Sequence, residues 1–362
     1  MQTYPIPMVP GPVKVPEAVR EVYRTDFGSA DLESEFLELY QKTEANLKQI
    51  LGTGNQVVMQ SGEGMLGLWS ALKSCLRPGD RVLAIATGVF GDGIAEMAGA
   101  LGAQVRKISL AYNETISDLT AIEKAIVAFQ PKMITAVHCE TPSGTLNPLA
   151  EVGRLKKHHG VPLLYVDAVA SAGGTAVRGD AWHIDLCLGG SQKCLSSLPN
   201  MAFVAVSDTA WEIIDQVNYM GYDALKPFQK APAEGYFPYT PYWHGVAGLN
   251  AAAELILREG LPASFARHAA VAEYCRTRLT AMGLALFPAP NAVSSPTVTA
   301  VQVPGEWSWP EFDARLRRQG LVVGGSYGQL AGRVFRLGHM GTQANMELVK
   351  QALDVIERVM GE

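Results

Sequence analysis

Residues 185–193 read Asp185-Leu186-Cys187-Leu188-Gly189-Gly190-Ser191-Gln192-Lys193, an apolar run followed by small residues and one lysine. The run has the length of a buried strand. Because the lysine follows in an otherwise uncharged neighbourhood, we expect it to be partly desolvated. Desolvation lowers the pKa of an amine, so Lys193 is a candidate Schiff-base nucleophile. A lysine that extends from a loop into solvent would give the same local pattern, so other residues must decide between the two.

A carboxylate stands upstream, at the end of another apolar run. The stretch Leu163-Leu164-Tyr165-Val166-Asp167 ends 26 residues before Lys193. A buried carboxylate needs a cationic partner, and the protonated nitrogen of a pyridine ring is one. A ring nitrogen kept positive by Asp167 can accept the electrons released when an amino acid loses its α-proton. Since an aspartate at a strand end can also be a helix cap, Asp167 alone is weak support.

Apolar runs alternate with amphipathic helical stretches from about residue 55 to residue 207. In the predicted helix 118–129, Leu119, Ile122 and Ile126 share one face. This alternation predicts an α/β fold with a mostly parallel sheet covered on both sides. Polar groups at the carboxyl ends of its strands would meet in one crevice. The predicted strands are 56–60, 81–86, 133–138, 163–166, 185–188 and 202–206.

Three further strand ends carry useful groups. Ser61, Gly62 and Glu63 lie where a strand turns into a helix, and backbone amides at such a helix start form an anion site. Phe90 follows the next strand and can stack on a planar ring. Thr141 follows the strand after that, and its hydroxyl can hydrogen-bond a phenolic oxygen. The five strand ends together offer an anion seat, a stacking face, a hydroxyl, a carboxylate and an amine, which fit one ligand.

The rest of the chain predicts a second lobe. Aromatic residues, Pro and Gly crowd together over 218–243 as in a long functional loop. The residues after 261 read as helix, strand, helix, strand, helix. We therefore expect a large cofactor-binding domain over 1–250 and a smaller α+β domain over 251–362. The N-terminal arm, residues 1–20, is expected to pack near the smaller domain.

Composition narrows the classes of function. Lys plus Arg (30) against Asp plus Glu (35) gives a net charge of -5, without a basic cluster that could follow a phosphate backbone, so no nucleic-acid partner is expected. No 18 apolar residues follow one another, which predicts a soluble, cytoplasmic protein without a membrane partner. Five dispersed cysteines predict reduced thiols. No metal site is expected, because His138 with Cys139 and His158 with His159 lack further ligands at suitable spacing.

The order of motifs along the chain resembles the class V aminotransferases. This fold type I family includes the alanine-glyoxylate and serine-glyoxylate enzymes, and the resemblance implies a large domain with a mostly parallel seven-stranded sheet and a smaller C-terminal domain. The motifs that carry it span nearly the whole chain. They are Pro10-Gly11-Pro12, Ser61-Gly62, Gly88-Val89-Phe90-Gly91, Glu140-Thr141-Pro142-Ser143-Gly144, Asp167-Ala168-Val169, Gly190-Ser191-Gln192-Lys193, Tyr239-Thr240-Pro241 and Phe335-Arg336-Leu337-Gly338-His339-Met340-Gly341.

The resemblance implies roles residue by residue around a vitamin B6 ring, either pyridoxal 5'-phosphate or unphosphorylated pyridoxal or pyridoxamine. Lys193 would carry the aldehyde as a Schiff base and move the proton, and Asp167 would bind the ring nitrogen. Phe90 and Val169 would lie on the two ring faces, and Thr141 near the phenolic oxygen.

Around the ring's phosphate-bearing arm the resemblance implies Ser61, Gly62, Glu63, Gln192 and, from a neighbouring subunit, Thr240. On the substrate side it implies Arg336, whose guanidinium suits a carboxylate in bidentate geometry, together with Gly11 and Tyr327. Family members are dimers or larger, so a homodimer or homotetramer with a shared active site is implied. The small-molecule partners would be an amine and a 2-oxo acid.

Two positions depart from the common family pattern. Most relatives have a small or neutral residue where Glu63 stands, and a carboxylate there would face the phosphate at a cost of roughly 4 kcal/mol per charge pair at about 4 Å. Phe237 stands where a phosphate-binding tyrosine is common. Both departures are similar to the pyridoxamine-pyruvate aminotransferase branch, which uses unphosphorylated vitamin B6 as a substrate. That branch has a second arginine where Tyr327 stands, and residues 197–200 replace its usual Pro-Pro-Gly. Alternatively, Glu63 is simply a carboxylate near a helix N-terminus.

We therefore expect an aminotransferase that moves an amino group to pyruvate or glyoxylate, with pyridoxamine and pyruvate giving pyridoxal and alanine as the leading hypothesis. The alternatives are a pyridoxal-phosphate-dependent alanine- or serine-glyoxylate type, a lyase on the same fold, and a non-catalytic vitamin B6-binding protein. A dehydrogenase is disfavoured. Although Gly62-x-Gly64-x-x-Gly67 fits a dinucleotide fingerprint, the next strand ends at Ile85-Ala86-Thr87-Gly88 without the required acid.

Overall fold

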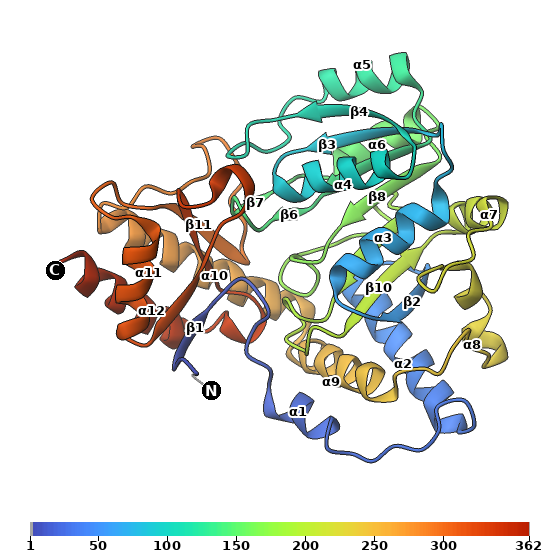
Figure 1. Ribbon diagram of the computed structural model, residues 1–362, viewed down its shortest axis with the longest axis horizontal. Coiled ribbons are helices and arrows are strands. Elements are labelled where there is room, and N and C mark those ends of the chain that lie inside the picture. Colours follow the sequence, from blue (N-terminus) through green and yellow to red (C-terminus); the bar gives the residue numbers. More distant parts are fainter. Residues whose placement is uncertain (1–2, 362) are drawn as a thin grey trace.

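The computed structural model describes residues 3–361, and its largest element is a seven-stranded sheet. The strands of this sheet are β2 (Gln56–Ser61), β3 (Arg81–Ala86), β4 (Gln104–Ser109), β5 (Met133–Val137), β8 (Leu163–Asp167), β9 (Leu186–Gly190) and β10 (Met201–Val206). Their order is β2-β10-β9-β8-β5-β3-β4 (Figure 1). All neighbouring pairs are parallel except those of β10, which is antiparallel to both β2 and β9. The strand β2 therefore ends at the same edge of the sheet as β3, β5, β8 and β9.

Helices lie on both sides of this sheet (Figure 1). The helical elements in this part of the chain are α1 (Glu17–Val22), α2 (Ser34–Leu51), α3 (Gly64–Cys75), α4 (Val89–Ala100), α5 (Thr120–Phe129), α6 (Ala150–His158), α7 (Asp208–Val217), α8 (Ala231–Glu234), α9 (Trp243–Glu259) and the short turn η1 (Lys226–Phe228). The helix α3 packs on β9 and β10, α4 on β3, and α6 on β8. Every residue of β5, β8, β9 and β10 is buried, as expected for strands with both faces covered.

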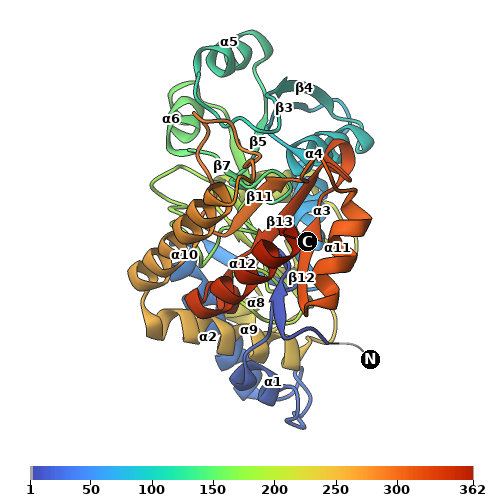
Figure 2. The same cartoon turned by 90° about the vertical axis from the view of Figure 1, so that its left-hand side faces the viewer.

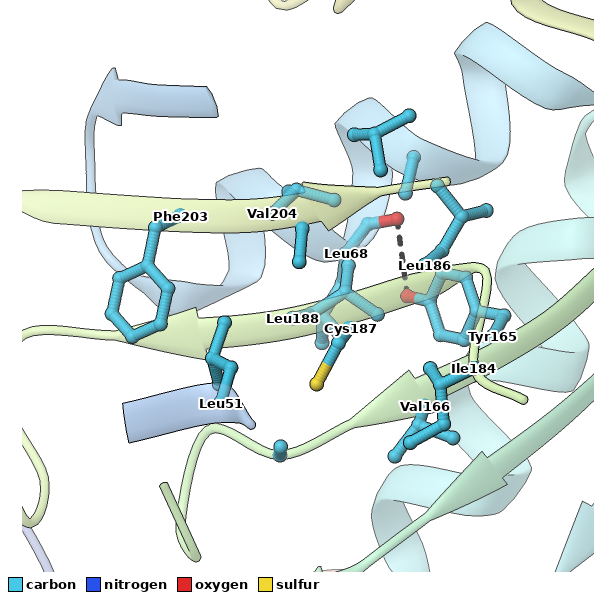
Figure 3. Close-up of a cluster of buried hydrophobic side chains, with 14 of the residues drawn as sticks. Leu51, Leu68, Tyr165, Val166, Ile184, Leu186, Cys187, Leu188, Phe203 and Val204 are labelled. Atoms are coloured by element: carbon cyan, nitrogen blue, oxygen red, sulfur yellow. Dashed lines mark hydrogen bonds between the residues drawn. The ribbon is translucent and has the colours of Figure 1, made fainter. Parts of the chain in front are cut away.

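Contacts in the core beneath α3 account for the buried hydroxyl of Tyr165, which Figure 3 shows, and for the glycine at position 189. Tyr165 is completely buried, and its hydroxyl donates to the Leu68 carbonyl at 3.2 Å, so its polar end is satisfied. A Cβ added to Gly189 would come within 2.1 Å of the Phe203 ring on the adjacent strand. The glycine that precedes the lysine motif is thus required by packing, and it lets a large aromatic ring fill the sheet next to the site.

A second, four-stranded sheet forms with the strand order β1-β12-β13-β11. The remaining elements are β1 (Ile6–Met8), β6 (Cys139–Glu140), β7 (Thr145–Leu146), α10 (Leu261–Ala281), β11 (Val298–Gln302), α11 (Trp309–Arg318), β12 (Leu321–Gly325), η2 (Gly328–Leu330), β13 (Val334–Gly338), η3 (Gly341–Gln343) and α12 (Met346–Met360). The strand β1 pairs in parallel with β12, so the N-terminal arm joins the C-terminal sheet. Figure 2 shows α10 and α12 side by side on this sheet, over a separate apolar cluster that includes Phe312 and Phe335.

The structure contains all six strands that the sequence predicted with bounds, whereas β1, β4, β6 and β7 were missed. The strand β4 is at the sheet edge and mostly polar, so it lacks the apolar run that marks the others. In the C-terminal lobe, β12 and β13 follow each other where one strand was expected. The domain boundary proposed at residue 250 falls inside α9, whose buried residues belong to the large cluster as far as Ile256. The division into domains stays a prediction.

Within residues 3–361, no helix has both the length and the apolar character needed to cross a membrane.

Candidate active site

A cavity of about 130 Å³ opens at the carboxyl edge of the large sheet. It is lined by Glu63, Gly64, Met65, Leu68, Phe90, Cys139, Thr141, Asp167, Val169, Ala170, Gln192 and Lys193. Seven of these were predicted from the sequence, and they follow five different strands of the sheet. A larger surface hollow of about 860 Å³ lies at the opposite edge, between Arg81 and Pro162, and contains none of the predicted residues. We therefore take the smaller cavity as the candidate site.

Lys193 reaches this cavity from the loop after β9. Burial, and secondarily the nearby Arg336 guanidinium, lower the pKa of its amine to about 8. Its Nζ donates to the Pro10 carbonyl at 2.5 Å. Gly11 lies directly against the lysine, because a Cβ there would stand 2.6 Å from Lys193 Cδ; its φ of +85° also favours glycine. The N-terminal arm thus forms one wall around the amine.

Asp167 occupies the last position of β8 and is only 6% exposed. Its Oδ1 accepts from the Val169 amide at 2.9 Å. Burial raises the pKa of this carboxyl to about 6, although that hydrogen bond and Lys193 oppose the shift. No ion pair to this carboxylate occurs among residues 3–361. A buried carboxylate without a cation partner is suited to a cationic ligand group.

The anion-binding site predicted at the start of α3 is occupied by a side chain of the protein itself. Glu63 is the N-cap of α3, and its Oε1 accepts from the Met65 amide at 3.1 Å. Its Oε2 accepts from the Gln192 Nε2 amide at 3.0 Å. The remaining oxygen of that amide, Gln192 Oε1, is buried and has no hydrogen-bond partner among the described residues. Glu63 therefore uses two donors that an anion at this helix start would need.

Phe90, Thr141 and Val169 form apolar and hydroxyl walls. Phe90 is the second residue of α4, and Thr141 is almost fully buried just after β6. Val169 follows Asp167, and a Cβ at Gly64 would lie 3.1 Å from both of its methyl groups. The start of α3 therefore packs directly on Val169, so Gly64 allows the helix N-terminus to approach the loop after β8.

Arg336 on β13 stands beside the cavity and is 3% exposed. Its Nε donates to the Gly325 carbonyl at 2.8 Å, and its Nη2 donates to the same oxygen. The Tyr327 ring lies 4.7 Å from the guanidinium carbon. No carboxylate pairs with Arg336 in the described part of the chain, so several of its N–H donors remain for an anionic ligand. Burial lowers its guanidinium pKa.

Gly11, Arg336 and Tyr327 stand beside the cavity without lining it, and three other predicted residues, Ser61, Gly62 and Thr240, also lie outside its lining. Ser61 ends β2 and lines a neighbouring small cavity, while the Gly62 amide donates to the Asn200 carbonyl at 2.8 Å. Thr240 is exposed and does not line the site of its own chain. Phe237 packs edge-on against Phe36, 5.3 Å between ring centroids, so it belongs to an aromatic cluster rather than to the cavity.

Comparisons with known proteins agree with this arrangement. The family model described as Aminotransferase class-V matches residues 11–334. The chain belongs to this family.

The class V relatives include a pyridoxamine–pyruvate transaminase of Mesorhizobium japonicum, which is 33% identical over 356 residues and aligns with 94% of this chain and 87% of that protein. The crystal structure of pyridoxamine-pyruvate aminotransferase from Mesorhizobium loti matches with a TM-score of 0.94 at 32% identity, covering 100% of this chain and 94% of that one. An alanine–glyoxylate aminotransferase from Nostoc sp. matches with the same TM-score at 30% identity, covering 99% and 96%. The predicted fold type I architecture and the aminotransferase class are thereby confirmed.

Some groups in this class V site carried no usable signal in the sequence. Pro10 acts through its backbone carbonyl, which any residue type could supply. Cys139 lines the cavity, and its thiol lies 3.1 Å from the Ser295 hydroxyl, far away in the sequence. Glu140 was quoted only as part of a motif. A charged residue between two runs of buried residues is the one signal that could have singled it out.

The sequence predicted no metal site, and that stays a prediction. The structure does supply a third group near His158 and His159, because Glu123 Oε1 lies 3.0 Å from His159 Nε2. The ligand atoms of all three lie within 4.8 Å of one another on α5 and the end of α6. They are far along the strands from the candidate site, at the edge of the sheet where the strands begin.

Proposed function

We propose that this class V aminotransferase transfers the amino group of pyridoxamine to pyruvate, giving pyridoxal and alanine, and that it uses vitamin B6 without a phosphate as its substrate. The observation that carries this proposal is the position of Glu63. Its carboxylate occupies the N-terminus of α3 and holds the Gln192 amide. A phosphate at the same place would meet a negative charge and would have to displace Glu63 from both donors.

The hydrogen-bond acceptors beside Glu63 fit a hydroxyl better than a phosphate. Glu63 and the unpartnered Gln192 Oε1 are both acceptors, and a buried acceptor gains most from a donor. The 5'-hydroxymethyl group of pyridoxamine or pyridoxal supplies such a donor. A phosphate dianion offers mainly acceptors. The opposite orientation of the Gln192 amide is disfavoured, because its oxygen would then face the Glu63 carboxylate.

The remaining walls fit the ring of the vitamer. Phe90 and Val169 would contact its faces, Thr141 its phenolic oxygen, and Asp167 its protonated nitrogen. When bound, the pyridine ring supplies an electron sink for the pair released as a proton leaves the carbon that bears nitrogen. Asp167 serves this chemistry by keeping a negative charge at the ring nitrogen.

Lys193 and Arg336 would divide the remaining work. Lys193 Nζ would move the proton from the carbon of pyridoxamine that bears the amino group to C2 of the 2-oxo acid, whose carbonyl oxygen leaves as water. The neutral amine would then hold the pyridoxal product as a Schiff base until water releases it. A pKa of about 8 leaves a useful neutral fraction near neutral pH. Arg336 binds the carboxylate of the 2-oxo acid with the donors that Gly325 leaves free.

We also propose a homo-oligomer with a shared site, in which Thr240 serves the cavity of a neighbouring subunit. Large side chains exposed in and beside the same loop support this proposal, since Tyr222 and Tyr236 are 71% and 70% exposed. Met65, at the mouth of the cavity, is also partly exposed. A second copy of the chain would cover them.

A second candidate function is a transaminase that keeps pyridoxal phosphate bound and uses alanine and glyoxylate. Tyr327 favours it, because the pyridoxamine-pyruvate branch has an arginine there. The alanine–glyoxylate enzyme from Nostoc sp. matches this chain as well as the pyridoxamine-pyruvate enzyme does.

Turnover separates the two candidates. Purified enzyme freed of vitamin B6 is mixed with pyridoxamine and pyruvate, and pyridoxal and alanine are measured by chromatography. The proposal expects both products in equal amounts without added pyridoxal phosphate, and none with Lys193→Ala. If products form only from alanine and glyoxylate after pyridoxal phosphate is added, the second candidate is correct and the first is wrong.

A further inference from the structure

Glu140 is a fully buried carboxylate that does not line the cavity. It ends the short strand β6, immediately before Thr141. Its Oε2 accepts from the Phe90 amide at 3.2 Å, and its Oε1 accepts from the Gly91 amide at 2.7 Å. One carboxylate thus binds two successive backbone amides that are 50 and 49 residues earlier in the chain.

These two amides belong to the first turn of α4. The first amides of any helix lack partners within the helix and are usually satisfied by a capping side chain. The N-cap of α4 is Gly88, which has no side chain, and no cap hydrogen bond is made there. Glu140 replaces the missing cap from another strand. Burial raises the pKa of this carboxyl to about 8, while the two amide hydrogen bonds oppose that rise, so the capping role rests on the hydrogen-bond geometry.

The glycines around this contact match the space that Glu140 needs. A Cβ at Gly88 would lie 2.6 Å from Glu140 Cδ and 2.7 Å from its Oε2. The φ of Gly88 is 179°, an extended value open to any residue, so the carboxylate, rather than the backbone, excludes a side chain. A Cβ at Gly91 would lie 2.9 Å from the Ala86 backbone.

Phe90 lies between these glycines, and its ring forms a wall of the cavity. We propose that Glu140 is a positioning residue of the active site: by holding the Phe90 and Gly91 amides it fixes the start of α4, and so sets the Phe90 ring against the face of the bound pyridine. The proposal rests on the proposed function only for the identity of that ring. Glu140 itself touches neither the ligand nor Lys193, and acts through Phe90.

The ligand-free protein provides the first test. Amide hydrogen exchange is followed by mass spectrometry over residues 86–92 in wild type and in Glu140→Gln, whose neutral amide can accept from one N–H but opposes the other. We expect exchange in this segment to become at least tenfold faster, with α3 unchanged. Equal exchange in both proteins would show that Glu140 does not hold the Phe90 and Gly91 amides, and would overturn the proposal whether or not any vitamer binds.

A double-mutant cycle then tests whether Glu140 acts through Phe90. The dissociation constant of pyridoxal, or of pyridoxal phosphate if that is the ligand, is measured by absorbance for wild type, Glu140→Gln, Phe90→Ala and the double variant. We expect each single change to weaken binding about tenfold, and the double variant to bind within twofold of Phe90→Ala. Multiplying effects would show that Glu140 acts independently of Phe90 and would overturn the proposal.

One variant serves as a control and another as an independent test. Glu96→Gln makes the same substitution at an exposed position of α4 and should change neither exchange nor binding. Gly88→Ala introduces a methyl group against the Glu140 carboxylate and should reproduce the effects of Glu140→Gln, which keeps the test open if that variant does not fold. If Gly88→Ala behaves like wild type, the proposal is wrong. A wild type that binds neither vitamer would refute the proposed function. The exchange result would still show whether Glu140 holds the Phe90 and Gly91 amides.

Discussion

Replacing Glu63 with glutamine should switch the preference of the pocket toward the phosphorylated vitamer. Glutamine has the same shape, and its side-chain oxygen can still accept from the Met65 amide, as Glu63 Oε1 does at 3.1 Å. The negative charge is removed, and the new NH2 group faces Gln192 Nε2, so the Gln192 amide must turn over for its oxygen to accept from it. The change therefore tests electrostatics at this position with little change in packing.

The magnitude follows from the positions of the donors. Met65 N and Gln192 Nε2 are 3.1 and 3.0 Å from the carboxylate, so a phosphate that shares them would stand about 4 Å from Glu63. One like-charge pair at about 4 Å costs roughly 4 kcal/mol at an effective dielectric near 20, or about a thousandfold in affinity. Glu63 is half-buried, and water screens part of this repulsion. We therefore expect Glu63→Gln to gain between about tenfold and a thousandfold in affinity for pyridoxal phosphate.

The assay is a pair of absorbance titrations of enzyme freed of vitamin B6, one with pyridoxal and one with pyridoxal phosphate. The ratio of the two dissociation constants is compared between proteins, because effects on the ring site cancel in it. Glu63→Asp keeps the charge and should keep the ratio near that of wild type. A ratio for Glu63→Gln within twofold of wild type would refute the assignment of Glu63 to the 5' arm.

Three further predictions concern the amine and the carboxylate site. Lys193→Ala should abolish covalent attachment of the aldehyde, seen as loss of the mass increase after borohydride reduction, whereas continued turnover at the wild-type rate would exclude Lys193 as the nucleophile. Because the pKa of Lys193 is lowered to about 8, the neutral amine is the minor form below that pH. Stopped-flow attachment rates should rise about tenfold per pH unit between pH 6 and 7 and level off above pH 8.5, and a flat profile would contradict this. Arg336→Lys should raise KM for the 2-oxo acid by about 10-fold to 100-fold with a smaller change in kcat, since lysine lacks the parallel N–H donors with which a guanidinium binds a carboxylate. An unchanged KM would place the carboxylate elsewhere.

The fold could be predicted because its central strands are continuous apolar runs. The strands β5, β8, β9 and β10 are buried at every position, so burial on both faces leaves a strong local signal. The strand β4 lies at the sheet edge, where four of its six residues are exposed and none is buried, so it leaves little local signal. One strand was expected where β12 and β13 stand, because the charged Arg336 of β13 is buried against the Gly325 carbonyl of β12, a contact between two strands that no local pattern reveals.

Residues of the site that follow strands could also be predicted, since parallel strands end at one edge. This applies to Asp167 and Lys193, which line one cavity. Contacts that depend on separate parts of the chain could not be predicted. The Pro10 carbonyl reaches Lys193 only because β1 pairs with β12, and Glu140 reaches α4 only through the tertiary fold. The hydrogen bond from Gln192 Nε2 to Glu63 likewise joins two residues that are 129 positions apart in the chain.

The most direct test of the central claim offers both vitamers to the wild-type enzyme at once. Enzyme freed of vitamin B6 is incubated with equal concentrations of pyridoxal and pyridoxal phosphate and reduced with borohydride, and the modified peptide is identified by mass spectrometry. The structure predicts a single adduct on Lys193 whose mass corresponds to pyridoxal without phosphate. A phosphorylated adduct on Lys193 would contradict the role assigned to Glu63, and an adduct on another lysine would contradict the site itself.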